Sequence, residues 1–351
     1  MRPNLLFTRF RFVAFILLTL SAALVIKVVR PLASTNIIRT AAKGAAPVIA
    51  NTRYVATTGN NASNNCLNSL SPCASLSYAA GQAVSGDTIQ IEAGIYTEAG
   101  TDSSGKSLTI IGAGTEATIL QAAASPGIAT DRVLRLSGQP CTLQDLTIRH
   151  GVSPSGGGIN IVNSQVTLNN VAVTDNRAMD VGATTGLNGG GISINSGSLT
   201  LNNSTVSNNT VTTSDSLLTR GNGGGIFIGA SAPVTLNNST VSGNSAIRGG
   251  GGIYFSGSAV NISYSTIAGN TSDSDNDGVG DGGGVYRNAG TVNLKSSIVA
   301  GNKKGTSGTT NAVADCGGTI TSQNYNLTGS GTGCSLSGTG DQTVTPSNVF
   351  T

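Results

Sequence analysis

The chain has 351 residues, of which 10% are charged and 4% are aromatic, with 49 glycines and no tryptophan. So little charge and so much glycine is atypical of a helical domain and favours stacked β-strands. The net charge of +3 comes from residues 1–53, which carry eight basic residues and no acidic one. The remainder carries 11 basic and 16 acidic residues, a net charge of −5. This balance leaves no basic stripe to neutralise phosphates, which argues against nucleic acid as a partner.

An export signal is predicted at the N-terminus. Arg9 and Arg11 precede the uncharged segment 12–26. This segment has the length of a signal-peptide core and is shorter than the about 20 apolar residues that span a membrane. Cleavage is predicted after Ala33 or Ala50. We assign residues 1–50 to a signal peptide, or to an uncleaved signal anchor, with a linker. The protein is therefore predicted to be secreted or held at the cell surface, with membrane contact only through an uncleaved anchor.

Residues 51–345 are predicted to form one domain, which five copies of a single pattern dominate. Each copy has a glycine triplet, an I-x-I strand, a V/L-x-L strand and a third strand that ends at asparagine. The copies span 156–176, 189–209, 223–244, 250–270 and 282–302. Apolar residues alternate within each strand, which gives it one inward and one outward face. One unit cannot bury its inward face alone, so the units are predicted to stack as parallel strands in a solenoid.

Weaker copies of the pattern precede the five regular ones. Segments 87–91 and 107–111 are predicted as irregular coils, and segment 134–148 matches the repeat without its glycines, for a total of about eight coils. Cys141 falls in an inward column and is predicted to be a buried thiol. The glycine triplets are assigned to turns that need positive φ or close backbone approach. The terminal asparagines are predicted to form a hydrogen-bonded ladder at one turn; they are Asn176, Asn209, Asn244, Asn270 and Asn302.

The GGG[IV] and x-x-N repeats resemble those of the right-handed parallel β-helix (pectin-lyase-like) superfamily. They are also similar to the repeats of polymorphic outer-membrane proteins, although the phenylalanine of that motif is replaced, as in 241–244. The resemblance implies an all-β, single-stranded, right-handed parallel β-helix, with a short helix at 75–84 that caps the first coil. Because the superfamily contains both enzymes and non-catalytic surface proteins, the resemblance fixes the fold and leaves the activity open.

The inserts that join each asparagine to the next glycine triplet are predicted to project side by side along one edge, where solenoids often bind ligands. The last insert contains Asp273, Asp275, Asp277 and Asp281 in a D-x-D-x-D-G pattern. Alternating carboxylates with a glycine at the bend are typical of calcium loops, and the pattern resembles the start of an EF-hand. Gly284 replaces the bidentate glutamate, so we predict weak calcium binding in a structural role. The alternative is a solvated acidic loop.

The outward position of the first strand carries three consecutive aromatic residues, Phe227, Tyr254 and Tyr286. On successive coils these side chains would form a ladder. The ladder is a candidate carbohydrate-binding surface, and the alternative is that it only stabilises the stack.

The candidates for catalysis are sparse. Arg220 and Arg248 each lie just before a glycine triplet, beside the acidic insert, and could serve a lyase as base next to a cation. The remaining acids are scattered, and His150, the only histidine, has no triad partners in its neighbourhood. A non-catalytic scaffold that binds carbohydrate or partner surfaces is therefore favoured. The alternative is a calcium-dependent polysaccharide lyase, or another polysaccharide-degrading enzyme of this superfamily.

The cysteines fit an oxidising compartment, with two local disulfides predicted, Cys66–Cys73 and Cys316–Cys334. Arg287 takes the place of an inward apolar residue in the fifth copy, which predicts that the stack opens and ends there. Residues 303–345 are assigned to a C-terminal cap.

Overall fold

The computed structural model describes residues 49–180, 186–213, 221–306, 309–329, 333–334 and 336–344. The chain divides into two units, Met1–Ala46 and Pro47–Thr351, and every described residue belongs to the second. The predicted signal peptide or anchor lies outside the described residues except for its last two positions. Within the part that the structure describes, no helix is long and apolar enough to cross a membrane.

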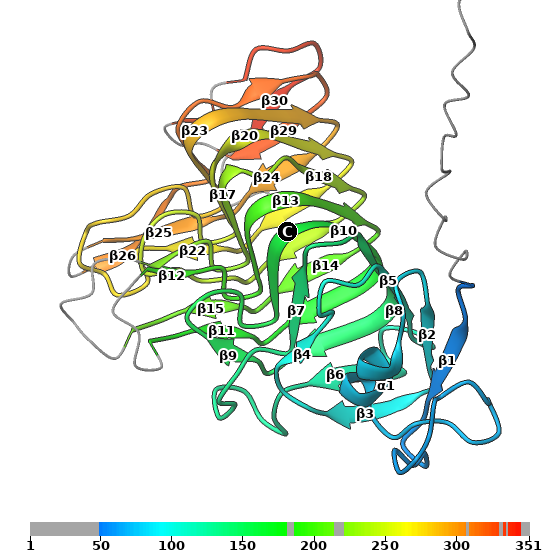
Figure 1. Ribbon diagram of the computed structural model, residues 1–351. Coiled ribbons are helices and arrows are strands. Elements are labelled where there is room, and N and C mark those ends of the chain that lie inside the picture. The colour runs from blue at the N-terminus through cyan, green and yellow to red at the C-terminus, as the bar shows by residue number, and fades with distance from the viewer. Residues whose placement is uncertain are drawn as a thin grey trace, which may run out of the picture. The chain divides into compact units, whose positions relative to one another are not determined.

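Parallel strands stack in three columns, one for each strand of the repeat (Figure 1). The first column consists of β4 (Thr101–Asp102), β7 (Leu134–Ser137), β10 (Ile159–Thr174), β13 (Ile192–Asn202), β17 (Ile226–Ser231), β20 (Ile253–Ser263), β23 (Val285–Lys295) and β27 (Cys316–Gly317). The second consists of β1 (Thr52–Val55), β2 (Thr88–Ile91), β5 (Leu108–Ile111), β8 (Cys141–Arg149), later parts of β10 and β13, β18 (Val234–Asn237), later parts of β20 and β23, and β28 (Thr321–Ser322). The third consists of β3 (Gly94–Thr97), β6 (Thr118–Gln121), the ends of β8 and β10, β14 (Thr205–Ser207), β19 (Thr240–Ser242), β21 (Thr266–Ala268), β24 (Ile298–Ala300), β29 (Leu327–Gly329) and β30 (Gln342–Val344).

The inserts add short strands of their own on one side of the stack, on the left of Figure 1. They form three small sheets: β9 (Val152–Ser153) with β11 (Arg177–Ala178) and β15 (Thr210–Val211); β12 (Leu187–Asn188) with β16 (Gly221–Asn222); and β22 (Thr271–Ser272) with β25 (Lys303–Thr306) and β26 (Thr309–Val313). The pairing of β25 with β26 is antiparallel. This arrangement confirms that the inserts project along a common edge.

The alternation of the repeat builds the core. Ile192 pairs with Ile226 and Ile194 with Ile228, and all four side chains are fully buried. Their outward neighbours alternate with them, as expected for strands with a side-chain period of two. The single helix among the described residues, α1 (Leu76–Gln82), begins after the N-cap Ser75 and confirms the predicted short helix. Its buried residues Leu76, Ala79 and Ala80 join the same core.

The glycine triplet leaves space for the terminal asparagine of the same coil. Only the first glycine of each triplet has positive φ, as at Gly189 (φ 66°). The third glycine packs against the asparagine of its own coil, because a Cβ on Gly191 would lie 2.9 Å from the Asn209 amide. Asn209 is fully buried, and its Oδ1 accepts hydrogen bonds from Asn176 N and Nδ2, each of 3.0 Å. Asn209 Nδ2 donates in turn to Asn244 Oδ1 at 3.0 Å, so the predicted ladder is confirmed.

The ladder continues to Asn302 and ends on a carboxylate that the sequence did not reveal. Asp315 Oδ1 accepts from both Asn302 N and Asn302 Nδ2 at 2.8 Å. A second hydrogen-bonded ladder, formed by serines at another turn, also ends on a carboxylate. At its end Ser297 N donates to Asn326 Oδ1, and Asn326 N donates to Asp341 Oδ1 at 2.9 Å.

The second strand column is longer than the predicted total of about eight coils. Eight strands of the second column, β2 to β23, lie where the sequence predicts coils, and β1 and β28 add one strand at each end. The pairing also corrects the expectation that the stack ends at Arg287. This residue pairs with Phe255, as predicted, but its half-buried side chain is satisfied because Nε donates to Gly290 O at 2.6 Å.

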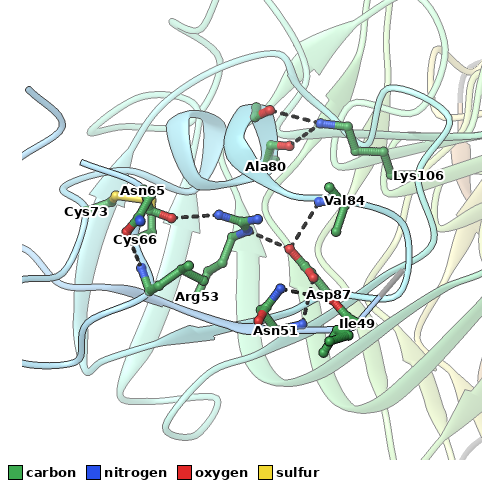
Figure 2. A network of polar contacts seen from close by, with 12 residues as sticks. Ile49, Asn51, Arg53, Asn65, Cys66, Cys73, Ala80, Val84, Asp87 and Lys106 are labelled. Atoms are coloured by element: carbon green, nitrogen blue, oxygen red, sulfur yellow. Dashed lines mark hydrogen bonds and ion pairs between the residues drawn. A yellow bond between two sulfur atoms is a disulfide. The ribbon is translucent and has the colours of Figure 1, made fainter. Parts of the chain in front are cut away.

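A buried ion pair fixes the N-terminal end of the stack (Figure 2). Arg53 Nε lies 2.6 Å from Asp87 Oδ2, and Asp87 also accepts from the backbone of Asn51 and Val84. Arg53 Nη1 donates to Asn65 O beside the Cys66–Cys73 disulfide. Burial alone would raise the pKa of Asp87, but these hydrogen bonds outweigh it and hold the pKa below its usual 3.8.

Replacement of one ladder amide should destabilise the whole stack. Asn244→Ala removes four buried hydrogen bonds and leaves the backbone N–H of Asn209 without its acceptor, so we expect a loss of about 3 kcal/mol in the free energy of unfolding. Asn237→Ala is the matched control, since its partly buried amide donates one hydrogen bond to Asn202, and it should cost about 1 kcal/mol or less. Urea denaturation measures both. Equal losses would contradict the role of the ladder.

Asp87 should make stability depend on pH in the acid range. Its lowered native pKa means that folding favours the ionised form, which stabilises the native state above about pH 4 and is lost as the pH falls through the native pKa. Asp87→Asn should therefore show a smaller loss of stability between pH 5 and pH 2 than the unmodified protein. The exposed Asp131→Asn is the control. Identical pH profiles for Asp87→Asn and the unmodified protein would refute this assignment.

Candidate functional site

The insert edge has a small core of its own. Ala178, Leu187, Val211, Ala246 and Ile247 form a buried apolar cluster separate from the main core. The cluster lies among the inserts, and Arg248 follows its last residue, Ile247, directly in the chain.

An open pocket of about 350 Å³ is lined both by inserts and by strands of the first column. Its wall combines Asn222 and Arg248 from two inserts, Tyr254 and Tyr286 from β20 and β23, and Val279 to Asp281 from the acidic insert. Arg248, Tyr254, Tyr286 and Asp281 were singled out from sequence for three separate reasons, and the fold brings them together. Asn222 was missed because its position follows from insert packing and no motif marks it.

The aromatic ladder forms as predicted. The ring centroids of Phe227 and Tyr254 lie 5.4 Å apart at an interplanar angle of 8°, and those of Tyr254 and Tyr286 lie 5.4 Å apart at 22°. Gly249 and Gly317 lie against Tyr286, where a Cβ would come within 3.0 Å of the ring. The ring faces are therefore largely covered, and the pocket meets the edges of Tyr254 and Tyr286.

The acidic insert brings three of its four carboxylates together. Asp273, Asp275 and Asp277 each offer an oxygen within 4.8 Å of the others, so this group could hold a metal ion. Asp281, the fourth predicted ligand, is not in this group. It lines the pocket, and its Oδ1 accepts from Gly282 N at 2.8 Å.

Asp273 occupies the inner position of this group. Its side chain is fully buried, and Oδ2 has no hydrogen-bond partner. Burial raises the pKa of Asp273 to about 6, and the neighbouring Asp275 and Asp277 act in the same direction. A buried, unpartnered carboxylate oxygen is costly unless a cation satisfies it, and hard cations such as calcium prefer oxygen ligands. The donor set fits such an ion.

Arg248 is bound to both ends of this acidic segment. Its carbonyl accepts from Asp273 N at 3.2 Å, and its Nη1 donates to both oxygens of Asp277 at 2.9 and 2.8 Å and to Val279 O at 2.8 Å. The side chain is 12% exposed. Arg220, the other candidate base, lies outside the described residues.

Other residues singled out from the sequence are a turn residue, a buried thiol and disulfide cysteines outside the pocket wall. His150 is buried in a left-handed turn with Nδ1 3.0 Å from Ala123 O. Cys141 is a buried free thiol, and burial raises its pKa. Both predicted disulfides are present, Cys66–Cys73 and Cys316–Cys334.

No protein-family model matches the sequence, and no curated protein is similar to it in sequence. Among solved structures, the chain is similar to that of pectate lyase Pel9A, with 18% identity over 84% of this chain and 77% of that chain, at a TM-score of 0.55. A comparison with pectin methylesterase from carrot gives 15% identity over 86% of this chain and 90% of that chain, at a TM-score of 0.44. At 18% identity, the first likeness establishes the fold and leaves the activity open. The chain therefore has the pectin-lyase-like parallel β-helix fold.

Proposed function

We propose that the protein is an exported, non-catalytic β-helix scaffold that binds carbohydrate in the pocket at its insert edge, with calcium bracing the acidic insert. One observation supports this most directly. The pocket combines two aromatic side chains with a guanidinium, a carboxylate and an amide. Saccharides present hydroxyl groups around an apolar ring, and this mixture of polar and aromatic groups matches both features.

The polar groups of the pocket supply both donors and acceptors. Arg248 donates only, Asp281 accepts when ionised, and Asn222 and the two tyrosine hydroxyls do both. Since the tyrosine ring faces are covered, a sugar would meet ring edges and hydroxyls. This favours recognition by hydrogen bonding over stacking.

The same geometry offers little for catalysis. A glycosidase needs two carboxylates, and Asp281 is the only one in the described wall of the pocket. A lyase needs a base, but the Arg248 guanidinium is engaged with Asp277 and Val279. Arginine side chains act as donors in proteins and are poor bases.

Calcium is the proposed occupant of the Asp273, Asp275 and Asp277 group. The buried oxygen of Asp273 and the two exposed carboxylates together would give three ligands of the type that calcium prefers. Export is supported by the two disulfides, which persist in oxidising compartments.

A calcium-dependent polysaccharide lyase is the second candidate. It is favoured by the likeness to pectate lyase Pel9A together with the position of Arg248 beside the acidic group. In that case Arg248 would have to leave Asp277 and act on the substrate as a base.

Removal of a pocket side chain should weaken saccharide binding. Tyr254→Ala should reduce affinity about tenfold or more, because the variant loses aromatic contact and a hydroxyl in the pocket. The measurement is isothermal titration calorimetry with an acidic oligosaccharide, oligogalacturonate, and a neutral one, cellotriose. Tyr264→Ala, which removes an exposed tyrosine outside the pocket wall, is the control. Equal affinities in both variants would place the binding surface elsewhere.

The second candidate predicts a different outcome. Unsaturated product absorbing at about 235 nm, formed from polygalacturonate with calcium, abolished by chelator and by Arg248→Ala, would establish a lyase. We expect no such product, because a guanidinium is a charged donor and a poor proton acceptor.

Calcium binding should depend on pH through Asp273. The ion requires the ionised carboxylate, and burial raises the pKa of this group to about 6, so calcium affinity should fall about tenfold per pH unit below pH 6. At pH 7 calcium should raise the melting temperature, and Asp275→Asn should abolish most of the increase. Asp131→Asn, which lies outside the acidic insert, is the control and should leave the calcium response unchanged. A melting temperature that does not respond to calcium would exclude the ion as a brace.

A further inference from the structure

The acidic insert and the pocket share a residue. Arg248 lines the pocket, and the same side chain donates to both oxygens of Asp277. Val279, Gly280 and Asp281, which also line the pocket, follow directly in the chain. Any change at Asp277 therefore reaches the pocket wall within a few residues.

The guanidinium occupies the place of a counter-ion. Three carboxylates lie within one cluster, one of them fully buried with an unpartnered oxygen, and the Arg248 guanidinium forms an ion pair with one of them, Asp277. A divalent ion that entered the cluster would lie a few ångströms from the guanidinium. Two cations at that separation repel one another strongly where solvent is partly excluded.

We infer that Arg248 and a divalent cation compete for Asp277, so that cation binding at Asp273, Asp275 and Asp277 releases the Arg248 guanidinium into the pocket. This inference rests on the proposed function in one respect, namely that the pocket is a saccharide site. In the cation-free protein Arg248 serves as an internal substitute for the metal. In the cation-bound protein it presents its donors to the ligand in the pocket.

Hydrogen bonds within the acidic segment would hold its turn when a cation replaces Arg248 at Asp277. Asp273 N is bonded to Arg248 O, Asn276 N to Asp273 O at 3.1 Å, and Gly278 N to Asp273 Oδ1 at 3.3 Å. These contacts hold the acidic segment in its turn without the Arg248 side chain. Release of the guanidinium breaks its bonds to Asp277 and Val279 and leaves these contacts in place.

The exchange predicts a result that needs no saccharide. If Arg248 competes with the cation, Arg248→Met should raise calcium affinity about tenfold, since the variant keeps the aliphatic packing and removes the competing charge. Calorimetric titration of the purified full-length protein with calcium chloride measures this. Arg135→Met is the control, because it breaks a comparable ion pair, with Asp102, outside the insert edge. Its calcium affinity should not change.

Arg248→Lys distinguishes competition between the Arg248 charge and calcium from disruption of the acidic segment by the substitution itself. Lysine keeps the charge but lacks the planar guanidinium, so its calcium affinity should lie between those of the unmodified protein and Arg248→Met. Unchanged or lower affinity in Arg248→Met, with a melting curve that shows a folded protein, would overturn the inference.

Saccharide binding provides a second test of the same inference. With oligogalacturonate as the probe, saturating calcium should raise saccharide affinity, and the saccharide should raise calcium affinity by the same factor. Asp275→Asn should remove this coupling while leaving saccharide binding at its calcium-free level. Failure of oligogalacturonate and cellotriose to bind under any condition would refute the proposed function, and the calcium titrations of the Arg248 variants would still decide the exchange. Binding of saccharide with no dependence on calcium would refute the coupling alone.

Discussion

A buried amide at one turn of each coil is the contact on which the rest of the structure depends. Each ladder asparagine bonds the backbone and side chain of its neighbour, as Asn209 does between Asn176 and Asn244. A buried amide without partners would be costly, so every coil must place its asparagine directly over the next. This requirement fixes the register of the coils, and the third glycine of each triplet leaves the space that the amide needs.

Register at this turn decides where the inserts leave the stack, and hence where the pocket forms. Successive inserts begin after successive ladder asparagines, so their short strands pair and their apolar residues share a small core. The outward aromatics of the first column then lie beside them in a stack. The pocket is thus a consequence of repetition, while its chemistry comes from residues that differ between the copies.

The few charged residues are concentrated where the repeat is interrupted. Asp315 and Asp341 accept the last donors of two ladders, and each ends a row of groups that all donate toward it. Asp87 and Arg53 pair at the opposite end of the stack. An ionised carboxylate accepts hydrogen bonds and has none to donate. It therefore suits the last position of a ladder, where no further coil supplies an acceptor.

The sequence was enough to predict the repeat, the inward columns, the asparagine ladder, both disulfides and the aromatic stack, because each follows from a pattern with a fixed period or from cysteines close along the chain. It also identified the carboxylates of the acidic insert. It missed the strands β1 and β28, which lack the pattern, and the satisfied surroundings of Arg287, whose partner Gly290 O depends on a local bend. Tertiary packing places Asp281 in the pocket wall and not in the carboxylate group, brings Asn222 to the same wall, and holds Arg248 against Asp277. The inserts vary in length and composition, so no periodicity governs them. Their side chains are placed by packing between coils that lie about thirty residues apart in sequence, as the separation of Arg248 and Asp277 illustrates.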